Sequence, residues 1–225
     1  MPAALIFDLD GTLIDSCRIC VDILSDMLAE RGSGHCIDMA IARPAMSHGG
    51  ERMVRALLGP ACGEPAQELA DFRARYAART TPVSSLYPGV MAGLTRLADR
   101  GHRLAICSNK PQNLCENALA DTGLAPLFTV VVGTRPGLRA KPAPDLLTET
   151  LRLLRAEAAE CIFIGDSELD DAVARAAAMP FHFLTHGYAD PAYRPDPGFA
   201  HDHFAGFAAT LLAQAPGKQR KAGHG

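Results

Sequence analysis

Five short apolar runs recur along this chain, and longer stretches with helical periodicity separate them. The runs cover residues 4–7, 103–107, 128–132, 161–164 and, more weakly, 181–184. A run of this kind is typical of a strand that is buried on both faces, as in a parallel sheet. Strands that alternate with helices predict an α/β fold, in which helices wrap a parallel sheet.

The stretch from about residue 16 to residue 80 breaks this alternation, because it has helical patterns but no convincing strand pattern. The helical patterns cover residues 19–30, 51–58 and 67–78. We therefore predict a small helical cap, residues 16–80, inserted into a core of residues 1–15 and 81–215. Residues 216–225 are rich in Gly and basic residues, and we expect a flexible tail there.

Composition and charge argue against several function classes. Hydrophobic residues make up 48% of the 225 residues, which allows a substantial core, and the formal net charge is −3. A nucleic-acid-binding domain would show a basic face, but the basic cluster here, Lys218, Arg220 and Lys221, lies in the predicted tail. Asp8 and Asp10 interrupt the N-terminal apolar run, and no run approaches the roughly 18 residues of a membrane span. We therefore expect a soluble cytoplasmic protein with no nucleic-acid or membrane partner.

The cysteines do not indicate a redox or metal function. Cys17 and Cys20 form a CxxC pair, but no second pair exists and the motif falls in a helical pattern. Cys107 and Cys161 lie inside predicted strands. We interpret these residues as reduced thiols that pack as small hydrophobic side chains.

Polar side chains suited to a phosphate site follow four of the predicted strands, directly or in the next loop. In an open α/β sheet, ligands bind beyond the carboxyl ends of the strands, so these side chains should converge. Each group alone is also typical of a turn, a helix cap or a surface charge. Together and in this order they predict a phosphate site. They are Asp8 with Asp10, Ser108 with Asn109, Lys141, and Asp166 with Asp170.

Asp8 and Asp10 form the candidate catalytic pair. A carboxylate can attack phosphorus and form an acyl-phosphate, which splits hydrolysis into two easier steps. Asp10 can give a proton to the leaving oxygen and then take one from water. Ser108 can donate a hydrogen bond to a phosphoryl oxygen, and Lys141 supplies positive charge at the reaction centre.

The clustered carboxylates also predict a divalent cation. Carboxylates that share a site repel one another, and Mg²⁺ commonly binds through one or two carboxylates together with phosphate oxygens. Asp166, which follows Gly165, is the natural partner of Asp8 and Asp10 for this purpose. We therefore expect Mg²⁺ as the cofactor.

At these residues the chain resembles the haloacid dehalogenase (HAD) superfamily of phosphohydrolases. The resemblance spans about residues 4–190 and implies a Rossmann-like, three-layer core with a helical cap inserted after the first strand. It implies that Asp8 is the nucleophile and Asp10 the general acid and base, while Ser108 and Lys141 hold the phosphoryl group. The motifs are residues 8–16 (DLDGTLIDS), Ser108 after residues 104–107 (LAIC), residues 141–144 (KPAP) and residues 165–170 (GDSELD).

The same resemblance implies a set of metal ligands. Mg²⁺ would be bound by Asp8, Asp166 and the backbone carbonyl of Asp10, with Asp170 as a further carboxylate of the metal site. Asp10 also argues against a dehalogenase, because the dehalogenases of this superfamily lack the second aspartate.

Within the superfamily, the chain looks most like phosphoglycolate phosphatase, on the glycine-rich turn 47–50 (SHGG) and the segment 108–111 (SNKP). The cap should close over the leaving group and exclude water. We predict substrate contacts there from Arg43, His48 and Gly49, and from Asn109 in the core. Arg43 is the candidate for bidentate binding of a substrate carboxylate. The alternatives are a solvated Arg43 and a His48 that only packs beside the turn.

Several functions are compatible with these motifs. The leading one is a Mg²⁺-dependent phosphatase for a small phosphorylated metabolite, above all phosphoglycolate; a sugar phosphate or pyrophosphate is an alternative substrate. A phosphomutase shares the aspartyl-phosphate, but no second acidic or histidine feature of the cap clearly protects such an intermediate from water. The non-enzyme alternatives are a receiver-like signalling domain and a phosphate-binding protein without turnover. We expect a monomer or a homodimer.

Overall fold

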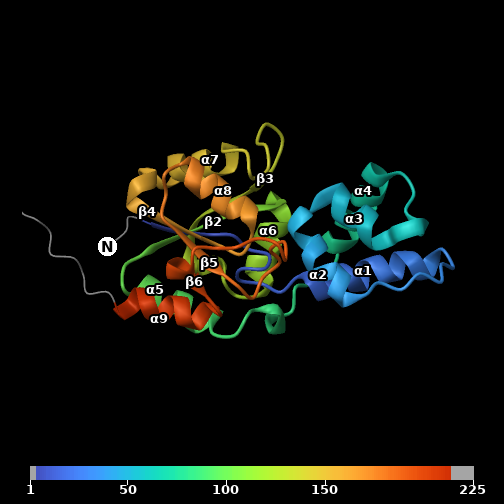
Figure 1. The fold of residues 1–225 in the computed structure, drawn as a ribbon, viewed down its shortest axis with the longest axis horizontal. Helices are drawn as coiled ribbons and strands as arrows, with labels where there is room; N and C mark the ends of the chain where they lie inside the picture. Colours follow the sequence, from blue (N-terminus) through green and yellow to red (C-terminus); the bar gives the residue numbers. More distant parts are fainter. Residues whose placement is uncertain (1–3, 214–225) are drawn as a thin grey trace, which may run out of the picture.

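The fold is built on a parallel sheet. The structure, a computed structural model, describes residues 4–213. Within that range, six strands pair in the order β3-β2-β1-β4-β5-β6, and every neighbouring pair is parallel (Figure 1). The strands are β1 Ala4–Phe7, β2 Arg103–Pro111, β3 Phe128–Thr134, β4 Cys161–Gly165, β5 Phe181–Leu184 and β6 Ala200–His201.

β1 lies inside the sheet because all of its side chains are apolar and none is exposed to solvent. It pairs with β2 on one side and with β4 on the other, so that Phe7 lies opposite both Ile106 and Ile164. The chain runs outward through β2 and β3 on one side of β1 and through β4, β5 and β6 on the other. This change of direction is the point at which open α/β sheets bind ligands, and Asp8 follows β1 there directly.

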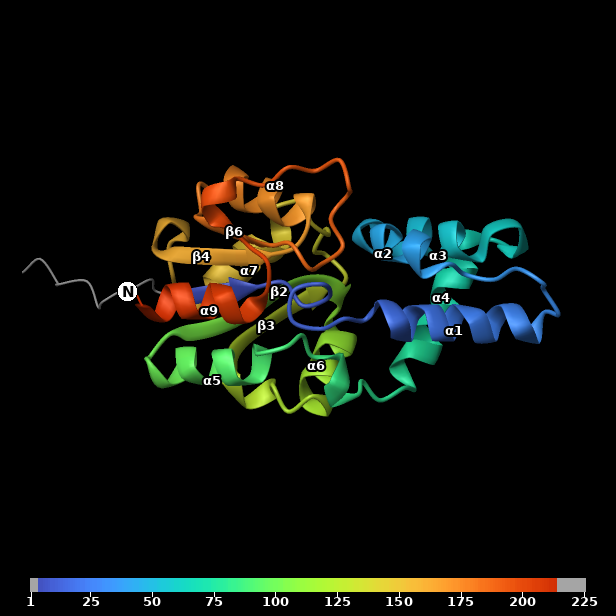
Figure 2. The ribbon, with the colours of Figure 1, turned by 60° about the horizontal axis from the view of Figure 1, so that its bottom comes forward.

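Helices cover both faces of the sheet, which confirms the predicted Rossmann-like, three-layer arrangement. Side chains alternate along β1: Leu5 and Phe7 pack against α5, α6 and α9, whereas Ala4 and Ile6 face α7 and α8. Figure 2 shows α5 and α6 on one side of the strands and α8 on the other. These helices are α5 Val90–Asp99, α6 Gln112–Asp121, α7 Asp145–Leu154, α8 Glu168–Ala176 and α9 Phe204–Ala213.

Four helices between β1 and α5 form the cap expected from the sequence. They share an apolar core that includes Ile23, Val54 and Phe72, and they lie beside the sheet domain (Figure 1). The predicted bounds of the cap, 16–80, enclose all four helices but stay a prediction. The predicted tail, 216–225, lies outside the described residues. The helices are α1 Cys17–Glu30, α2 Met39–His48, α3 Gly50–Leu58 and α4 Pro65–Ala77.

The sequence pattern does not predict α2, for a local reason. Pro44 lies inside this helix, where a proline removes one backbone donor and crowds the preceding turn. Asp38 stabilises the other end, because its carboxylate accepts a 2.8 Å hydrogen bond from the backbone N–H of Ala40. Gly49, with φ +55°, ends α2 and allows α3 to begin at the next residue. The glycine-rich turn is therefore a junction between two helices.

The remaining local structure is short. Single turns of 3₁₀ helix cover Gly59–Ala61, Val83–Ser85, Ala125–Leu127, Ala158–Glu160 and Pro197–Phe199. Over residues 4–213, no helix combines the length and the apolarity that crossing a membrane requires.

Cys17 and Cys20 are buried free thiols at the start of α1, and burial raises the pKa of Cys17 to about 11. This environment agrees with thiols that pack as hydrophobic side chains.

Candidate active site

A cavity of about 840 Å³ lies between the cap and the carboxyl ends of β1, β2 and β4. The cap contributes residues from α1, α2, α3 and α4 to its lining, together with Gly49 between α2 and α3. Strand ends far apart in the sequence meet here, as the parallel sheet predicts. The predicted core residues that line the cavity are Asp8, Asp10, Ser108, Asn109, Lys141 and Asp166.

Asp8 is the residue that directly follows β1. Its backbone N–H donates a 2.9 Å hydrogen bond to the carbonyl oxygen of Ile164, which continues the pairing of β1 with β4 and fixes its position. Its Oδ1 lies 2.9 Å from Nζ of Lys141, yet accepts no well-aligned hydrogen bond from the residues that the structure describes. Burial raises the pKa of Asp8 to about 6, although the charge of Lys141 opposes this shift. The Asp8 carboxylate therefore lies in the cavity lining with the positive charge of Lys141 beside its buried Oδ1.

Lys141 carries a buried ammonium group that three oxygen atoms surround. Besides the contact with Asp8, its Nζ donates to the carbonyl oxygen of Cys107 at 3.0 Å and to Oδ1 of Asp170 at 2.5 Å. Burial by itself lowers the pKa of Lys141, but the charges of Asp170 and Asp8 outweigh burial and hold the pKa above its usual range. Lys141 therefore keeps a fixed positive charge beside Asp8.

Ser108 and Asn109 reach the cavity because β2 continues beyond its apolar run, with a shift of register against β3 near its end. Ser108 is almost fully buried, and its Oγ accepts a 3.3 Å hydrogen bond from the backbone N–H of Lys110. The Asn109 side chain makes two hydrogen bonds with the backbone of Lys141. Asn109 Oδ1 accepts from the Lys141 N–H at 2.7 Å, and Asn109 Nδ2 donates to the Lys141 carbonyl oxygen at 3.1 Å. Asn109 thus positions Lys141 as well as lining the cavity.

Asp10 is paired with Lys110, a residue that the motifs alone do not single out. Nζ of Lys110 donates to Oδ1 and to Oδ2 of Asp10, each at 3.1 Å. The same ammonium lies 4.0 Å from the ring centroid of Tyr76 in the cap, a cation–π contact. Burial, the largest single influence, lowers the pKa of Lys110, but Asp10, Tyr76 and Cys20 together outweigh it and hold the pKa above its usual range. The segment 108–111 was the only signal for this residue in the sequence.

Asp166 directly follows β4 and is held from two sides. Thr12 Oγ1 donates to its Oδ1 at 2.6 Å, and the backbone N–H of Tyr188 donates to its Oδ2 at 2.8 Å. Glycines make room for it, because a Cβ atom added to Gly11 or to Gly187 would lie 2.2 Å from atoms of Asp166. The sequence pattern indicates Asp166 but not the contacts from Thr12 and Tyr188.

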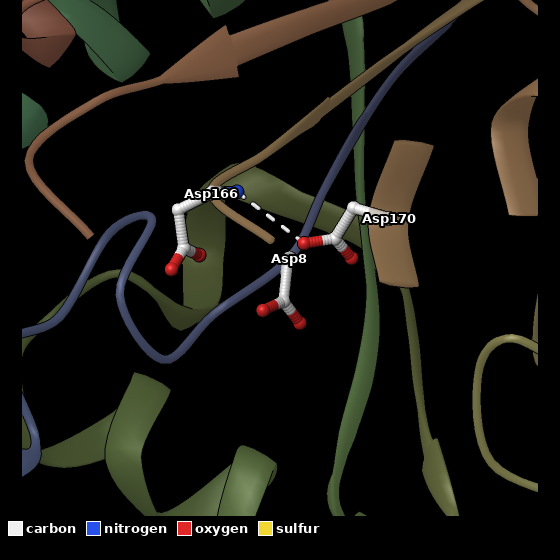
Figure 3. A group of neighbouring side chains, drawn as sticks. All are labelled: Asp8, Asp166 and Asp170. Atoms are coloured by element: carbon white, nitrogen blue, oxygen red, sulfur yellow. Dashed lines mark hydrogen bonds between the residues drawn. The ribbon is translucent and has the colours of Figure 1, made fainter. Parts of the chain in front are cut away.

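Asp170 lies in the first turn of α8, where Ser167 is the N-cap. Asp170 Oδ2 accepts from the backbone N–H of Ser167 at 3.1 Å and from its hydroxyl at 2.6 Å. It also lies 3.3 Å from the backbone nitrogen of Asp166, the contact dashed in Figure 3. Because Oδ1 accepts from Lys141, protein donors engage both oxygens of Asp170. This carboxylate therefore anchors Lys141 and the start of α8.

Asp8, Asp166 and Asp170 each offer an oxygen atom, and these atoms lie within 4.8 Å of one another (Figure 3). Burial, followed by the charges of Asp170 and Asp8, raises the pKa of Asp166 well above its usual range. The negative charge of the three carboxylates thus exceeds the positive charge of the neighbouring Lys141. Oxygen donors with excess negative charge fit a divalent cation such as Mg²⁺, and Asp8 and Asp166 line the cavity whereas Asp170 is not part of its lining. The side chain of Asp10 is not part of this cluster.

The predicted cap residues lie in different places. Gly49 lines the cavity, and His48 is the last residue of α2. Arg43 is not part of the lining: its Nη1 donates to Oδ2 of Asp15 at 3.0 Å and its Nη2 to the carbonyl oxygen of His186 at 3.0 Å. The substrate roles of Arg43 and His48 stay predictions.

A helical cap inserted into a parallel α/β core, over a site with two aspartates after the first strand, is the arrangement of the HAD-like hydrolases. The family model for "Haloacid dehalogenase-like hydrolase" matches residues 5–184, and the chain therefore belongs to this family. The sequence resemblance is confirmed.

Relatives narrow the class further. A "Phosphoglycolate phosphatase" from Rhodobacter capsulatus is 38% identical over 193 residues, 84% of this chain and 86% of the relative. Another, from Rhodospirillum rubrum, is 34% identical over 229 residues, 98% of this chain and 95% of the relative. A solved structure of a predicted phosphoglycolate phosphatase from Haemophilus somnus 129pt matches this chain with a TM-score of 0.75 at 23% identity. The match covers 93% of this chain and 97% of the solved chain, which shows that the two share a fold. The chain is a hydrolase of the phosphatase type, as predicted.

Proposed function

We propose that this phosphatase hydrolyses phosphoglycolate in a Mg²⁺-dependent reaction, through an aspartyl-phosphate formed on Asp8. The observation that carries the proposal is the surroundings of Asp8: its Oδ1 lies 2.9 Å from the Lys141 ammonium, and Asp10 lines the same cavity. A nucleophile, a fixed positive charge and a proton donor are the groups that a covalent phosphoryl transfer needs.

In the first half-reaction, a carboxylate oxygen of Asp8 attacks phosphorus and the bond from phosphorus to the glycolate oxygen breaks. Asp10 gives its proton to that leaving oxygen. Lys141 and the Ser108 hydroxyl hold the phosphoryl oxygens, so that their negative charge is offset. The two hydrogen bonds from Lys110 fix the position of the Asp10 carboxylate.

In the second half-reaction, water attacks the phosphorus of the aspartyl-phosphate and gives its proton to Asp10. The bond between phosphorus and the Asp8 oxygen breaks, which restores the Asp8 carboxylate and releases inorganic phosphate. The cap would cover the cavity and keep bulk water from the leaving group.

Mg²⁺ is the proposed cofactor, and phosphatases of this family generally use a divalent metal. Asp8 and Asp166 would hold the ion, together with the backbone carbonyl of Asp10 that the family resemblance implies. Asp170 would lie behind them as a supporting carboxylate. When bound, the ion would offset the charge of the phosphoryl oxygens.

Phosphoglycolate is the leading substrate because both relatives carry that name. A sugar phosphate and pyrophosphate remain alternatives. Asn109 and Gly49 are proposed contacts, since both line the cavity. The expected monomer or homodimer and the cytoplasmic location stay predictions.

The test is phosphate release from a panel of phosphoglycolate, a hexose phosphate, a nucleotide and pyrophosphate, each with and without Mg²⁺. Asp8→Asn is the test variant, and Asp171→Asn, which makes the same change outside the cavity lining, is its control. Metal-dependent release that is highest in kcat/KM for phosphoglycolate and lost only in Asp8→Asn would support the proposal. Release that Asp8→Asn retains would overturn the assignment of the nucleophile.

A further inference from the structure

Two arginine side chains of the cap line the cavity without a protein partner. Arg52 belongs to α3 and Arg73 to α4. Among residues 4–213, neither guanidinium makes a hydrogen bond or an ion pair. Both residues are exposed, so their charges face solvent or the contents of the cavity.

Most other arginines of the cap are paired with a carboxylate. Arg55 is the exception: it is exposed and unpaired within the described residues, but it does not line the cavity. Among the described cap arginines, only Arg52 and Arg73 are both unpaired and part of the cavity lining. The paired ones are Arg18 with Asp22, Arg31 with Glu68, Arg43 with Asp15, Arg75 with Glu30 and Asp71, and Arg79 with Asp26.

The positive charges on the core side of the cavity are already engaged. Lys110 is paired with Asp10, and Lys141 with Asp8 and Asp170. Arg135 also lines the cavity, but its guanidinium donates to Oε1 of Glu149 at 2.9 Å.

Spare positive charge therefore comes from the cap. Its lining includes two guanidiniums, Arg52 and Arg73, against one carboxylate, Glu51. Arg43, which the sequence suggested for binding a substrate carboxylate, has its donors occupied by Asp15 and His186 instead.

We propose that Arg52 and Arg73 form a subsite for a second anionic group of the substrate, so that the substrate class is a phosphate ester with a carboxylate or second phosphate at its other end. This inference rests on the proposed function. A guanidinium binds carboxylate or phosphate through paired hydrogen bonds, α3 packs against α4, and both arginines line the same cavity. The core would hold the phosphoryl end and the cap the distal anion.

The kinetic test compares two esters that differ in this charge, phosphoglycolate and the neutral-ended ethylene glycol monophosphate. In the double variant Arg52→Gln/Arg73→Gln, kcat/KM for phosphoglycolate should fall roughly 10- to 100-fold, because charge-assisted hydrogen bonds are lost. The value for ethylene glycol monophosphate should stay unchanged. Arg55→Gln is the matched control and should alter neither. An equal loss for both esters, or no loss for either, would overturn the subsite.

A binding test separates this inference from the proposed function. Asp8→Asn protein, with and without the two arginine substitutions, is titrated calorimetrically with phosphoglycolate, a hexose bisphosphate and ethylene glycol monophosphate. Weaker binding in the double variant of only phosphoglycolate and the hexose bisphosphate, the two ligands with an anionic group at each end, supports the subsite. This holds even if the unmodified enzyme hydrolyses neither ester, and that lack of hydrolysis would refute the proposed function but not the subsite. Tighter binding of the bisphosphate assigns the second anion as phosphate, and tighter binding of phosphoglycolate assigns it as carboxylate. Equal affinities with and without the arginines would overturn the inference.

Discussion

The backbone N–H of Tyr188 donates a 2.8 Å hydrogen bond to Oδ2 of Asp166. The phenol of the same residue donates to Oδ1 of Asp15 at 2.6 Å, and Oδ2 of Asp15 accepts from Arg43 at 3.0 Å. Arg43 belongs to α2 of the cap. Tyr188 thus connects the proposed metal ligand Asp166 to the cap, and we expect the position of the cap to affect the proposed metal site.

Tyr188→Phe should test this connection. Loss of the phenol hydrogen bond should lower the free energy of unfolding by about 1 kcal/mol and raise the Mg²⁺ concentration for half-maximal activity several-fold. Tyr193→Phe is a matched control, since it loses a 2.8 Å hydrogen bond to Asp171 and does not line the cavity. It should cost similar stability with an unchanged Mg²⁺ requirement. Denaturant unfolding and Mg²⁺ titration measure both effects; the same metal dependence in both variants would refute the connection.

Lys110→Met should lower kcat roughly 10- to 100-fold, because Asp10 loses the cation that fixes both of its oxygens. KM should change little, and Lys110→Arg, which keeps the charge, should retain more activity. Steady-state kinetics with phosphoglycolate, alongside circular dichroism as a check of folding, give the answer. A folded Lys110→Met enzyme with unaltered kcat would show that Asp10 does not depend on Lys110.

Asp166→Asn should raise the free energy of unfolding of the metal-free protein and reduce the further stabilisation that Mg²⁺ gives. Without metal, removing one of three clustered buried charges should raise the free energy of unfolding by about 1 kcal/mol. The stabilisation that Mg²⁺ gives should largely disappear, because a ligand stabilises only the state that binds it. Asp170→Asn is the contrast: it removes a partner of buried Lys141 and should cost about 3 kcal/mol. Thermal unfolding at graded Mg²⁺ tests both, and a full Mg²⁺ response in Asp166→Asn would exclude Asp166 as a ligand.

His182 should make the fold sensitive to acid. Its Nδ1 lies 2.8 Å from Nε2 of His201 between β5 and β6, and burial, followed by the charge of His201, lowers its pKa from 6.5 to about 4. The unfolded chain therefore binds a proton that the folded chain does not, so stability is present above pH 6.5 and is lost as the pH falls toward 4.

The variant His182→Gln should lose less stability than the parent between about pH 7 and about pH 5. After allowance for solvent screening, the difference is on the order of 1 kcal/mol. Urea unfolding of both proteins at the two pH values measures it. Equal losses in the two proteins would contradict the pKa assigned to His182.

The architecture could be predicted because its signals are local. A strand buried on both faces needs a continuous apolar run, and the run 4–7 is β1 itself. Elements that lack such a signal were not predicted. Pro44 argues against a helix at α2, and β6 has only two residues. The helix α9, Phe204–Ala213, is apolar around most of its surface rather than along one stripe.

The site could be predicted only as far as strand ends define it. Asp8 and Asp166 directly follow strands, Ser108 lies near the carboxyl end of β2, and the sheet brings the three together. Tyr188 acts on Asp166 through its backbone N–H, which no residue pattern shows. Likewise, an arginine looks the same in sequence whether its partner is a substrate or a carboxylate of its own chain, as Arg43 illustrates.

If Asp8 carries the phosphoryl group during turnover, the mass of the intact protein should show the covalent intermediate. The enzyme is mixed with phosphoglycolate and Mg²⁺, stopped in acid during the first turnovers, and compared with Asp8→Asn and with the control Asp171→Asn. We expect a mass increase of one phosphoryl group in the unmodified enzyme and in Asp171→Asn, located at Asp8 by peptide fragmentation, and none in Asp8→Asn. Turnover by folded Asp8→Asn, or a phosphoryl group on a different residue, would contradict it.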